Sequence, residues 1–293
     1  MSTPTSDERP GSWEWAMCGA SVVGDMHHRR GLGCDDAYRY GISGGLVVAA
    51  VADGAGSVSG TSAWGSYTAC QSVVRDALRA QFRRDFVTDP AGHPAQMRWL
   101  FECALDRVRR RAEAMKLELP LLSTTLSVVV ADRRRAVFGQ IGDGVIAVET
   151  DRGISTTLIE AKTDYANATW FLQSEDAFAS AFRTETLTGV TAFALSTDGM
   201  SYKITDITTG EAYEPFFRGS WRHVRAGTSS AHFAALLRDI ADDQTGDDKT
   251  MVLSALRWET DEFFPSARPV TTTIVGSPAP KVPHTRTHHS AHG

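Results

Sequence analysis

The chain of 293 residues is 42% hydrophobic and 22% charged, a composition that excludes disorder over its whole length. Thirty lysines and arginines against thirty-five aspartates and glutamates give a net charge of −5, so the charge balance indicates neither a nucleic-acid partner nor a membrane partner. Residues 1–10 are polar, and no apolar stretch approaches the roughly 18 residues that span a bilayer, so we expect a cytoplasmic protein. The four cysteines form no CxxC pair, which argues against a disulfide framework and a zinc site.

The first half of the chain predicts two strands followed by two helices. Residues 13–23 have strand character, and a turn rich in His, Arg and Gly follows over 24–34. The β-branched and alanine run at 46–52 predicts a buried strand that stops at a glycine-rich turn. Apolar residues at helical spacing then predict helices over 61–84 and about 94–117.

The second half is richer in predicted strands. Residues 125–131 and 136–148 predict a hairpin with a charged turn between them, and 163–188 predicts a loop with some helix. We expect three further strands and one short helix, at 154–159, 191–196, 251–256 and 231–241 respectively.

Strands grouped as hairpins and helices grouped in pairs favour an α+β fold. We divide the chain into a polar leader at 1–12, one domain at 13–260, and a tail at 261–293 that is rich in Pro, Thr and His and is predicted to be disordered.

Aspartates recur where predicted strands end. Asp53 and Asp198 each follow a strand, Asp143 interrupts a β run between two glycines, and Asp247 and Asp248 precede the last strand. A single aspartate of this kind is most often a turn former. Several such carboxylates gathered at the ends of sheets would repel one another unless a cation lay among them.

The residue types indicate which cation that would be. Carboxylate and carbonyl oxygens, without paired Cys or His at ligand spacing, favour Mg²⁺ or Mn²⁺ over zinc. Two such ions about 3.5–4 Å apart promote in-line displacement at phosphorus. Hydrolysis of a phosphate ester is therefore the chemistry that we expect.

Six short motifs strengthen this expectation because they occur in a known order. They are Asp35-Asp36-Ala37, Ala52-Asp53-Gly54-Ala55-Gly56, Ser123-Thr124-Thr125, Ile141-Gly142-Asp143-Gly144, Ser196-Thr197-Asp198-Gly199 and Asp247-Asp248-Lys249-Thr250. Each motif is weakly specific, but the ordered set over residues 18–256 resembles the metal-dependent serine/threonine protein phosphatases of the type 2C family, in its bacterial branch. The resemblance implies a four-layer α-β-β-α sandwich, in which helix pairs flank two central antiparallel sheets and a binuclear Mn²⁺/Mg²⁺ centre lies at one end.

The resemblance also implies a set of metal ligands. Asp53 would bridge the two ions, the Gly54 carbonyl would be a ligand, and Asp198 would hold one ion together with Asp247. The remaining implied ligands are Asp35 and Asp36, directly or through waters, and Asp143 at a third metal site. Asp247 is preferred over Asp248 because the family pattern puts the ligand three residues before the Ser/Thr, here Thr250, but Asp248 stays open.

The implied mechanism is attack of a metal-bridged hydroxide on a phosphoserine or phosphothreonine, without a phosphoenzyme. A protonated group would assist the leaving alkoxide. Phosphate would be bound by one of the four cations His27, His28, Arg29 and Arg30. We rank His27 and Arg29 first and count them, with Asp53 and Asp198, as the predicted catalytic residues; the alternative is a solvated basic turn.

The sequence also bears on the partner of the protein and on alternative functions. The implied partner is a phosphoprotein substrate, in opposition to a serine/threonine kinase. The alternative from another class is a phosphatase-like binding or regulatory module with weak turnover. The arginine runs at 107–111 and 133–135 predict a solvated helix face and a hairpin tip rather than a nucleic-acid patch.

Overall fold

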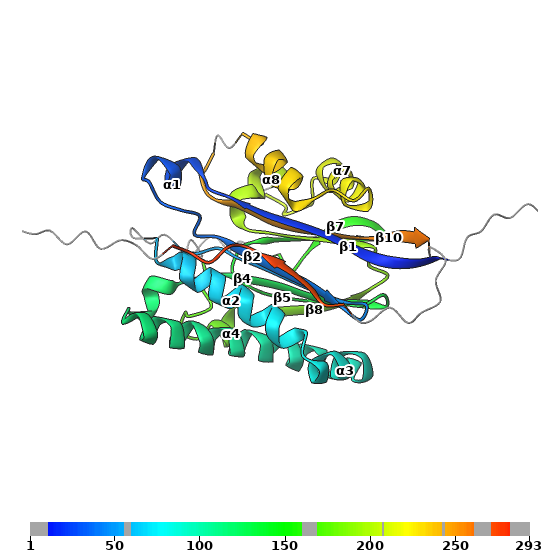
Figure 1. The fold of residues 1–293 in the computed structure, drawn as a ribbon, viewed down its shortest axis with the longest axis horizontal. Helices are drawn as coiled ribbons and strands as arrows, with labels where there is room; N and C mark the ends of the chain where they lie inside the picture. Colours follow the sequence, from blue (N-terminus) through cyan, green and yellow to red (C-terminus); the bar gives the residue numbers. More distant parts are fainter. Residues whose placement is uncertain are drawn as a thin grey trace, which may run out of the picture.

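The structure is a computed structural model, which describes residues 11–55, 60–159, 169–206, 208–241, 244–260 and 271–281. Two β-sheets lie face to face in the middle of the molecule, and helices cover the outer face of each sheet (Figure 1). The predicted α+β fold, a four-layer α-β-β-α sandwich, is confirmed. The predicted leader at 1–12 falls mostly outside the described residues, and its last two residues belong to the first strand.

Every strand pairs with its neighbours in the antiparallel sense. The first sheet has the order β1-β10-β9-β6-β7 and consists of β1 (Gly11–Val22), β6 (Val145–Thr150), β7 (Gly153–Thr157), β9 (Ala192–Ser196) and β10 (Lys249–Thr260). The second sheet has the order β11-β2-β3-β4-β5-β8 and consists of β2 (Ala37–Ser43), β3 (Leu46–Ala52), β4 (Leu126–Ala131), β5 (Arg135–Ile141), β8 (Arg183–Thr188) and β11 (Thr273–Gly276).

The helices divide between the two outer layers. The second sheet is covered by α2 (Ser62–Ala77), α3 (Ala80–Thr88), α4 (His93–Met115) and the short α5 (Ala177–Ser180). The first sheet is covered by α7 (Glu214–Arg225) and α8 (Ser230–Asp239). Two short helices, α1 (Asp25–Arg29) and α6 (Ser201–Ile204), lie in the connections.

Strand β3 shows why the sequence forms these layers. Its seven residues are all buried, and alternate side chains point to opposite faces of a strand. Val47, Ala49 and Val51 pack in the core between the two sheets. Val48, Ala50 and Ala52 pack beneath α2 and α4. A continuous apolar run is therefore required at a strand that is covered on both sides.

Several predicted elements differ from the observed ones. The predicted helix 61–84 is two helices, because Arg79 adopts an extended backbone between α2 and α3. The predicted β run 136–148 is β5 and β6, which belong to different sheets. The chain passes from one sheet to the other at Gly142, whose φ of +114° strongly favours glycine.

Several observed elements were not predicted. Strand β8 lies in the segment 163–188, which was predicted to be a loop with some helix, and residues 163–168 of that segment lie outside the described residues. Neither β2 nor α7 was predicted. The turn predicted at 24–34 contains the short helix α1.

The predicted disordered tail at 261–293 is wrong for its middle part. Strand β11 pairs with β2 at the edge of the second sheet. Ser277 then donates its N–H to the Tyr38 carbonyl, while its Oγ accepts from the Tyr38 N–H. The domain therefore extends beyond residue 260. Residues 261–270 and 282–293 lie outside the described part of the chain.

In the described parts of the chain, no helix has the length and apolar character needed to cross a bilayer.

Candidate metal centre

Four partly exposed aspartates lie where strands of the two sheets begin or end. Asp53 follows β3, Asp198 follows β9, Asp143 lies between β5 and β6, and Asp247 lies two residues before β10. The strand registers bring these places together, since Ser196 at the end of β9 pairs with both Met251 of β10 and Val145 of β6. Antiparallel pairing thus gathers carboxylates that are up to 194 residues apart in the chain.

The pKa values show that these carboxylates act on one another. Burial, then the charges of Asp198 and Asp247, raise the pKa of Asp53 well above its usual range. Burial, then the charges of Asp143 and Asp247, raise the pKa of Asp198 to about 7. The neighbouring charges that raise these two pKa values are all carboxylates, so the cluster lowers its energy by taking up positive charge.

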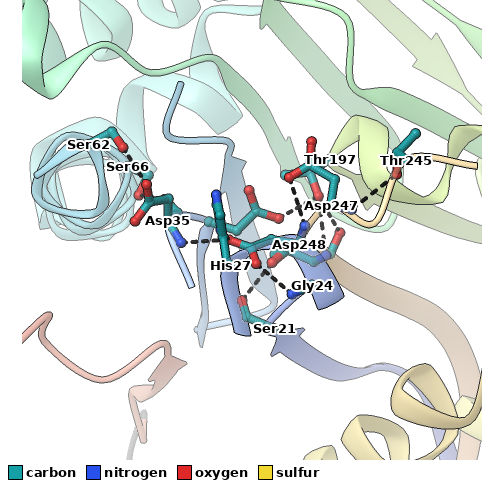
Figure 2. A network of polar contacts seen from close by, with 12 residues as sticks. Ser21, Gly24, His27, Asp35, Ser62, Ser66, Thr197, Thr245, Asp247 and Asp248 are labelled. Atoms are coloured by element: carbon teal, nitrogen blue, oxygen red, sulfur yellow. Dashed lines mark hydrogen bonds and ion pairs between the residues drawn. The ribbon is translucent and has the colours of Figure 1, made fainter. Parts of the chain in front are cut away.

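Asp35 and Asp36 are buried behind this cluster. The Asp36 carboxylate accepts a hydrogen bond from the Thr197 hydroxyl at 2.7 Å. Burial, then the charges of Asp53 and Asp248, raise its pKa well above the usual range, so it lies within electrostatic reach of Asp53. The Asp35 carboxylate instead turns toward α2, where it accepts from the Ser62 hydroxyl at 2.7 Å. Figure 2 shows Asp35 beside Ser62, apart from Asp247.

The two adjacent aspartates before β10 have different environments. Asp247 is partly exposed, and its charge acts on Asp53 and Asp198. Asp248 is only 3% exposed, and its carboxylate accepts hydrogen bonds from the backbone N–H groups of Gly24 at 2.7 Å and Asp35 at 2.6 Å. Asp248 therefore fastens the segment around α1 to the start of β10 (Figure 2).

Of the four predicted phosphate-binding residues, His27 contacts a carboxylate, that of Asp248. Its Nδ1 lies 2.9 Å from Oδ2 of Asp248, and its side chain is 12% exposed. His28, Arg29 and Arg30 are exposed at the surface of the same turn. Within the described residues, no hydrogen bond or ion pair involves the side chains of these three.

Gly54 lies where three segments meet. It forms an isolated bridge with Thr124, flanked by hydrogen bonds from Thr125 to Asp53 and from Ala55 to Ser123. These bonds use the neighbouring residues and leave the Gly54 carbonyl outside the pairing. A Cβ at Gly54 would lie 2.4 Å from the Asp35 carbonyl oxygen, so a side chain at this position would push apart the segments that carry Asp35 and Asp53.

The donor set fits hard divalent cations. Carboxylates and a backbone carbonyl are the ligands that Mn²⁺ and Mg²⁺ accept. One carboxylate oxygen of Asp143, Oδ1, is buried with no hydrogen-bond partner among the described residues, and such an atom is costly unless it finds a partner. No three His, Cys, Asp or Glu side chains in the described part of the chain converge on a ready-made cation site. A bound ion would offset the repulsion between these carboxylates and draw them together.

Sequence reasoning missed the hydroxyl groups that hold the acidic residues. Thr197 bonds to Asp36, and Ser62 bonds to Asp35, while the Ser66 hydroxyl donates to the Asp35 carbonyl. Thr197 belongs to one of the quoted motifs, so its position could have been inferred. Ser62 and Ser66 have no motif around them and were identified only by the position of α2.

A four-layer sandwich with aspartates gathered at one end of its sheets is the arrangement that the resemblance to the metal-dependent phosphatases implies, and the comparisons with known proteins agree. Protein phosphatase 2C is the family that matches, over residues 23–238, and the chain belongs to this family. The predicted class of enzyme, a protein-serine/threonine phosphatase, is confirmed.

The relatives cover most of the chain. Serine/threonine-protein phosphatase 3 of Escherichia coli (strain K12) is 27% identical over 256 residues, which are 82% of this chain and 98% of the relative. The serine/threonine phosphatase Stp1 from Staphylococcus aureus has a similar fold, with a TM-score of 0.58 at 13% identity over 86% of this chain and 99% of that one. The catalytic domain of the phosphatase PstP, in complex with two manganese ions, has a TM-score of 0.54 at 14% identity over 84% of this chain and 100% of that one.

Proposed function

We propose that the metal centre hydrolyses phosphoserine and phosphothreonine monoesters of protein substrates, with Mn²⁺ or Mg²⁺ as the cofactor. The observation that carries the proposal is the group of four partly exposed aspartates at one end of the sandwich, in which burial and the neighbouring carboxylates raise the pKa values of Asp53 and Asp198. Their oxygens are suited to hold two divalent ions, with Asp143 available for a third. Ions bound there would supply Lewis-acid chemistry: they would activate water and neutralise charge on the phosphoryl oxygens.

The proposed ligand roles follow the position of each residue. The Asp53 carboxylate interacts electrostatically with those of Asp198, Asp247 and Asp36. This central position suits a bridging ligand. The Gly54 carbonyl is not used in the adjoining strand pairing. Asp36 is held by the Thr197 hydroxyl next to the proposed ligands, whereas Asp35 is held by Ser62 of α2, further from them. We assign Asp247 as the ligand and Asp248 as a residue that positions the α1 segment.

Proton transfer to the leaving group is the proposed task of His27. Because Nδ1 of His27 is hydrogen-bonded to Asp248, Nε2 is the ring nitrogen left to approach the substrate. A carboxylate on one nitrogen orients a histidine and fixes which of its nitrogens faces outward. Arg29 is exposed in the same turn and has the planar donor geometry for two hydrogen bonds to phosphate.

In the proposed physiological setting, the protein acts in the cytoplasm and removes phosphate groups that a serine/threonine kinase has added. All four cysteines are free, as is usual for proteins in a reducing compartment.

The experiment is hydrolysis of p-nitrophenyl phosphate and of a phosphothreonine peptide with added Mn²⁺. We expect Asp53→Asn and Asp198→Asn to lower kcat/KM by about 100-fold or more, because removal of even outer-shell groups at metal sites costs 10- to 100-fold. Asp151→Asn is the matched control, since Asp151 is an exposed acid in the β6–β7 turn. Binding of Mn²⁺ without turnover of either substrate would instead support the phosphatase-like binding or regulatory module.

A further inference from the structure

The outer face of α2 carries a groove in which six of the twelve lining residues are arginines. Two adjoining hollows of about 250 and 380 Å³ share Gln71 and Arg75 as lining residues. Together they form what we call the arginine groove, whose six cations are Arg39, Arg75, Arg79, Arg107, Arg110 and Arg111. They come from β2, α2, α4 and the α2–α3 connection, so the groove is a product of the fold and not of one basic run.

The groove has a strong excess of positive charge. The carboxylates that pair with its arginines are Asp76, with Arg75, Arg79 and Arg107, and Asp106, with Arg110. Six guanidinium groups against two carboxylates leave an excess of four positive charges. This excess belongs to a chain whose net charge is −5, so the positive surface is local and is suited to an anionic partner.

A buried acid holds part of this surface in place. Asp76 is fully buried and lies beneath the groove, where it pairs with Arg107, and Arg107 also donates to the Ser72 hydroxyl. Arg107 is thereby ordered before any ligand arrives, which lowers the entropic cost of binding. Arg75 and Arg110 are 58% and 74% exposed, and their guanidinium groups remain accessible to a partner.

The groove faces away from the metal centre. Ser62 and Ser66 lie on the side of α2 that contacts Asp35. With 3.6 residues per turn, Gln71 and Arg75 lie on the opposite side of the same helix. A partner in the arginine groove would therefore leave the metal centre open to substrate.

We propose that the arginine groove binds an acidic segment of a partner protein. Guanidinium groups match carboxylates with paired hydrogen bonds. One end of the groove is lined by Leu78 and by Ile274, which is 43% exposed, so the segment carries an apolar residue at that end. A polypeptide is favoured over single-stranded nucleic acid because none of the described lining residues is aromatic, whereas nucleic-acid grooves use rings to stack bases.

The test is fluorescence anisotropy with a fluorescein-labelled peptide of eight glutamates followed by two leucines. We expect the wild-type chain to bind it and the double variant Arg75→Glu, Arg110→Glu to bind about tenfold more weakly or worse. The matched control is Arg222→Glu, Arg238→Glu, which makes the same change in charge at exposed positions of α7 and α8 on the opposite layer. We expect the control to bind within about twofold of the wild type.

The measurement needs no phosphatase activity, so its failure is distinguishable from failure of the proposed function. Absence of binding by the wild type, or equal weakening in both double variants, would overturn the proposal. So would tighter binding of a labelled ten-residue thymidine oligonucleotide with the same sensitivity to the groove variant, which would assign the groove to nucleic acid. If the double variant melts early, Arg110→Glu alone gives the comparison, because Arg110 pairs with the exposed Asp106.

Discussion

The two aspartates at the start of β10 show how burial assigns different tasks to the same side chain. Asp248 is buried and accepts two backbone N–H groups and His27. Asp247 is partly exposed and acts on the other acids of the cluster. The first arrangement is that of a structural anchor, whereas the second suits the metal ligand that we propose.

This difference predicts opposite effects for two matched substitutions. Asp248→Asn turns an amide NH₂ toward backbone donors, so we expect a loss of about 3 kcal/mol in the free energy of unfolding, with Mn²⁺ affinity of the folded protein within about threefold of the wild type. Asp247→Asn is expected to lower Mn²⁺ affinity by about tenfold or more with little loss of stability. Urea unfolding and calorimetric titration with Mn²⁺ measure the two quantities. The reverse pattern would make Asp248 the ligand.

We predict that Asp198 is necessary for activity but that its ionised carboxylate lowers the stability of the metal-free protein. Its folded pKa of about 7 lies above the usual value, so ionisation of this group at pH 8 destabilises the metal-free fold. We expect Asp198→Asn, which keeps an acceptor oxygen, to raise the free energy of unfolding of the chelated protein by about 2 kcal/mol. Urea unfolding in chelator at pH 8 checks this, with Asp151→Asn as the control. A less stable Asp198→Asn protein would show that the carboxylate is held by favourable contacts.

At the scale of elements, the site depends on where strands start and stop. The apolar run of β3 ends at Ala52, directly before Asp53, and a side chain at the next residue, Gly54, would collide with the Asp35 carbonyl. The turn at Gly142 passes the chain from one sheet to the other and places Asp143 at the same end. Each acid is therefore positioned by the strand before or after it.

Strand β11 gives a prediction about the edge of the second sheet. A chain ending at residue 265 lacks the pairing of β11 with β2, the bonds between Ser277 and Tyr38, and the Ser43 to Thr272 hydroxyl contact. We expect a loss of about 2–3 kcal/mol in the free energy of unfolding, since each such bond contributes about 0.5–1.5 kcal/mol. A chain ending at residue 281 is the control and should match the full chain in urea unfolding. Equal midpoints for the two shortened chains would contradict a structural role for β11.

At the scale of the whole molecule, we expect the proposed metal centre and the fold to be coupled. The clustered acids repel one another in the metal-free protein, and ions that bind the folded chain alone stabilise it by mass action. Both effects act on the same end of the sandwich, where β3, β5, β9 and β10 meet.

Chelation is therefore predicted to lower the melting temperature. At a free Mn²⁺ concentration about 100 times its Kd, the stabilisation is about 2.7 kcal/mol, which corresponds to a rise of about 5–10 °C for a domain of this size. Differential scanning calorimetry with Mn²⁺ and with chelator measures it, and K⁺ at equal ionic strength is the control. The same melting temperature in all three conditions would mean that the folded chain does not bind the ion.

The outcomes differ between elements for physical reasons. Strands β1, β3 and β9 were predicted because their apolar runs are long or bounded by clear turn residues. Strand β8 lies at the edge of its sheet, and its residues Arg183–Thr188 are mostly polar. Because it has no apolar run, it was not predicted. The break between α2 and α3 has neither glycine nor proline, so it gave no sequence signal. The metal ligands stay predictions.

By itself, the sequence determined the family, the layered α+β fold and the set of acids at the ends of strands, because these depend on local residue patterns in a fixed order. Only the tertiary structure decided that Asp248 anchors α1 while Asp247 faces the other acids, that the tail returns as β11, and that arginines from separate elements form one groove. These features depend on which side chains are buried together, and burial is decided by contacts between segments far apart in the chain.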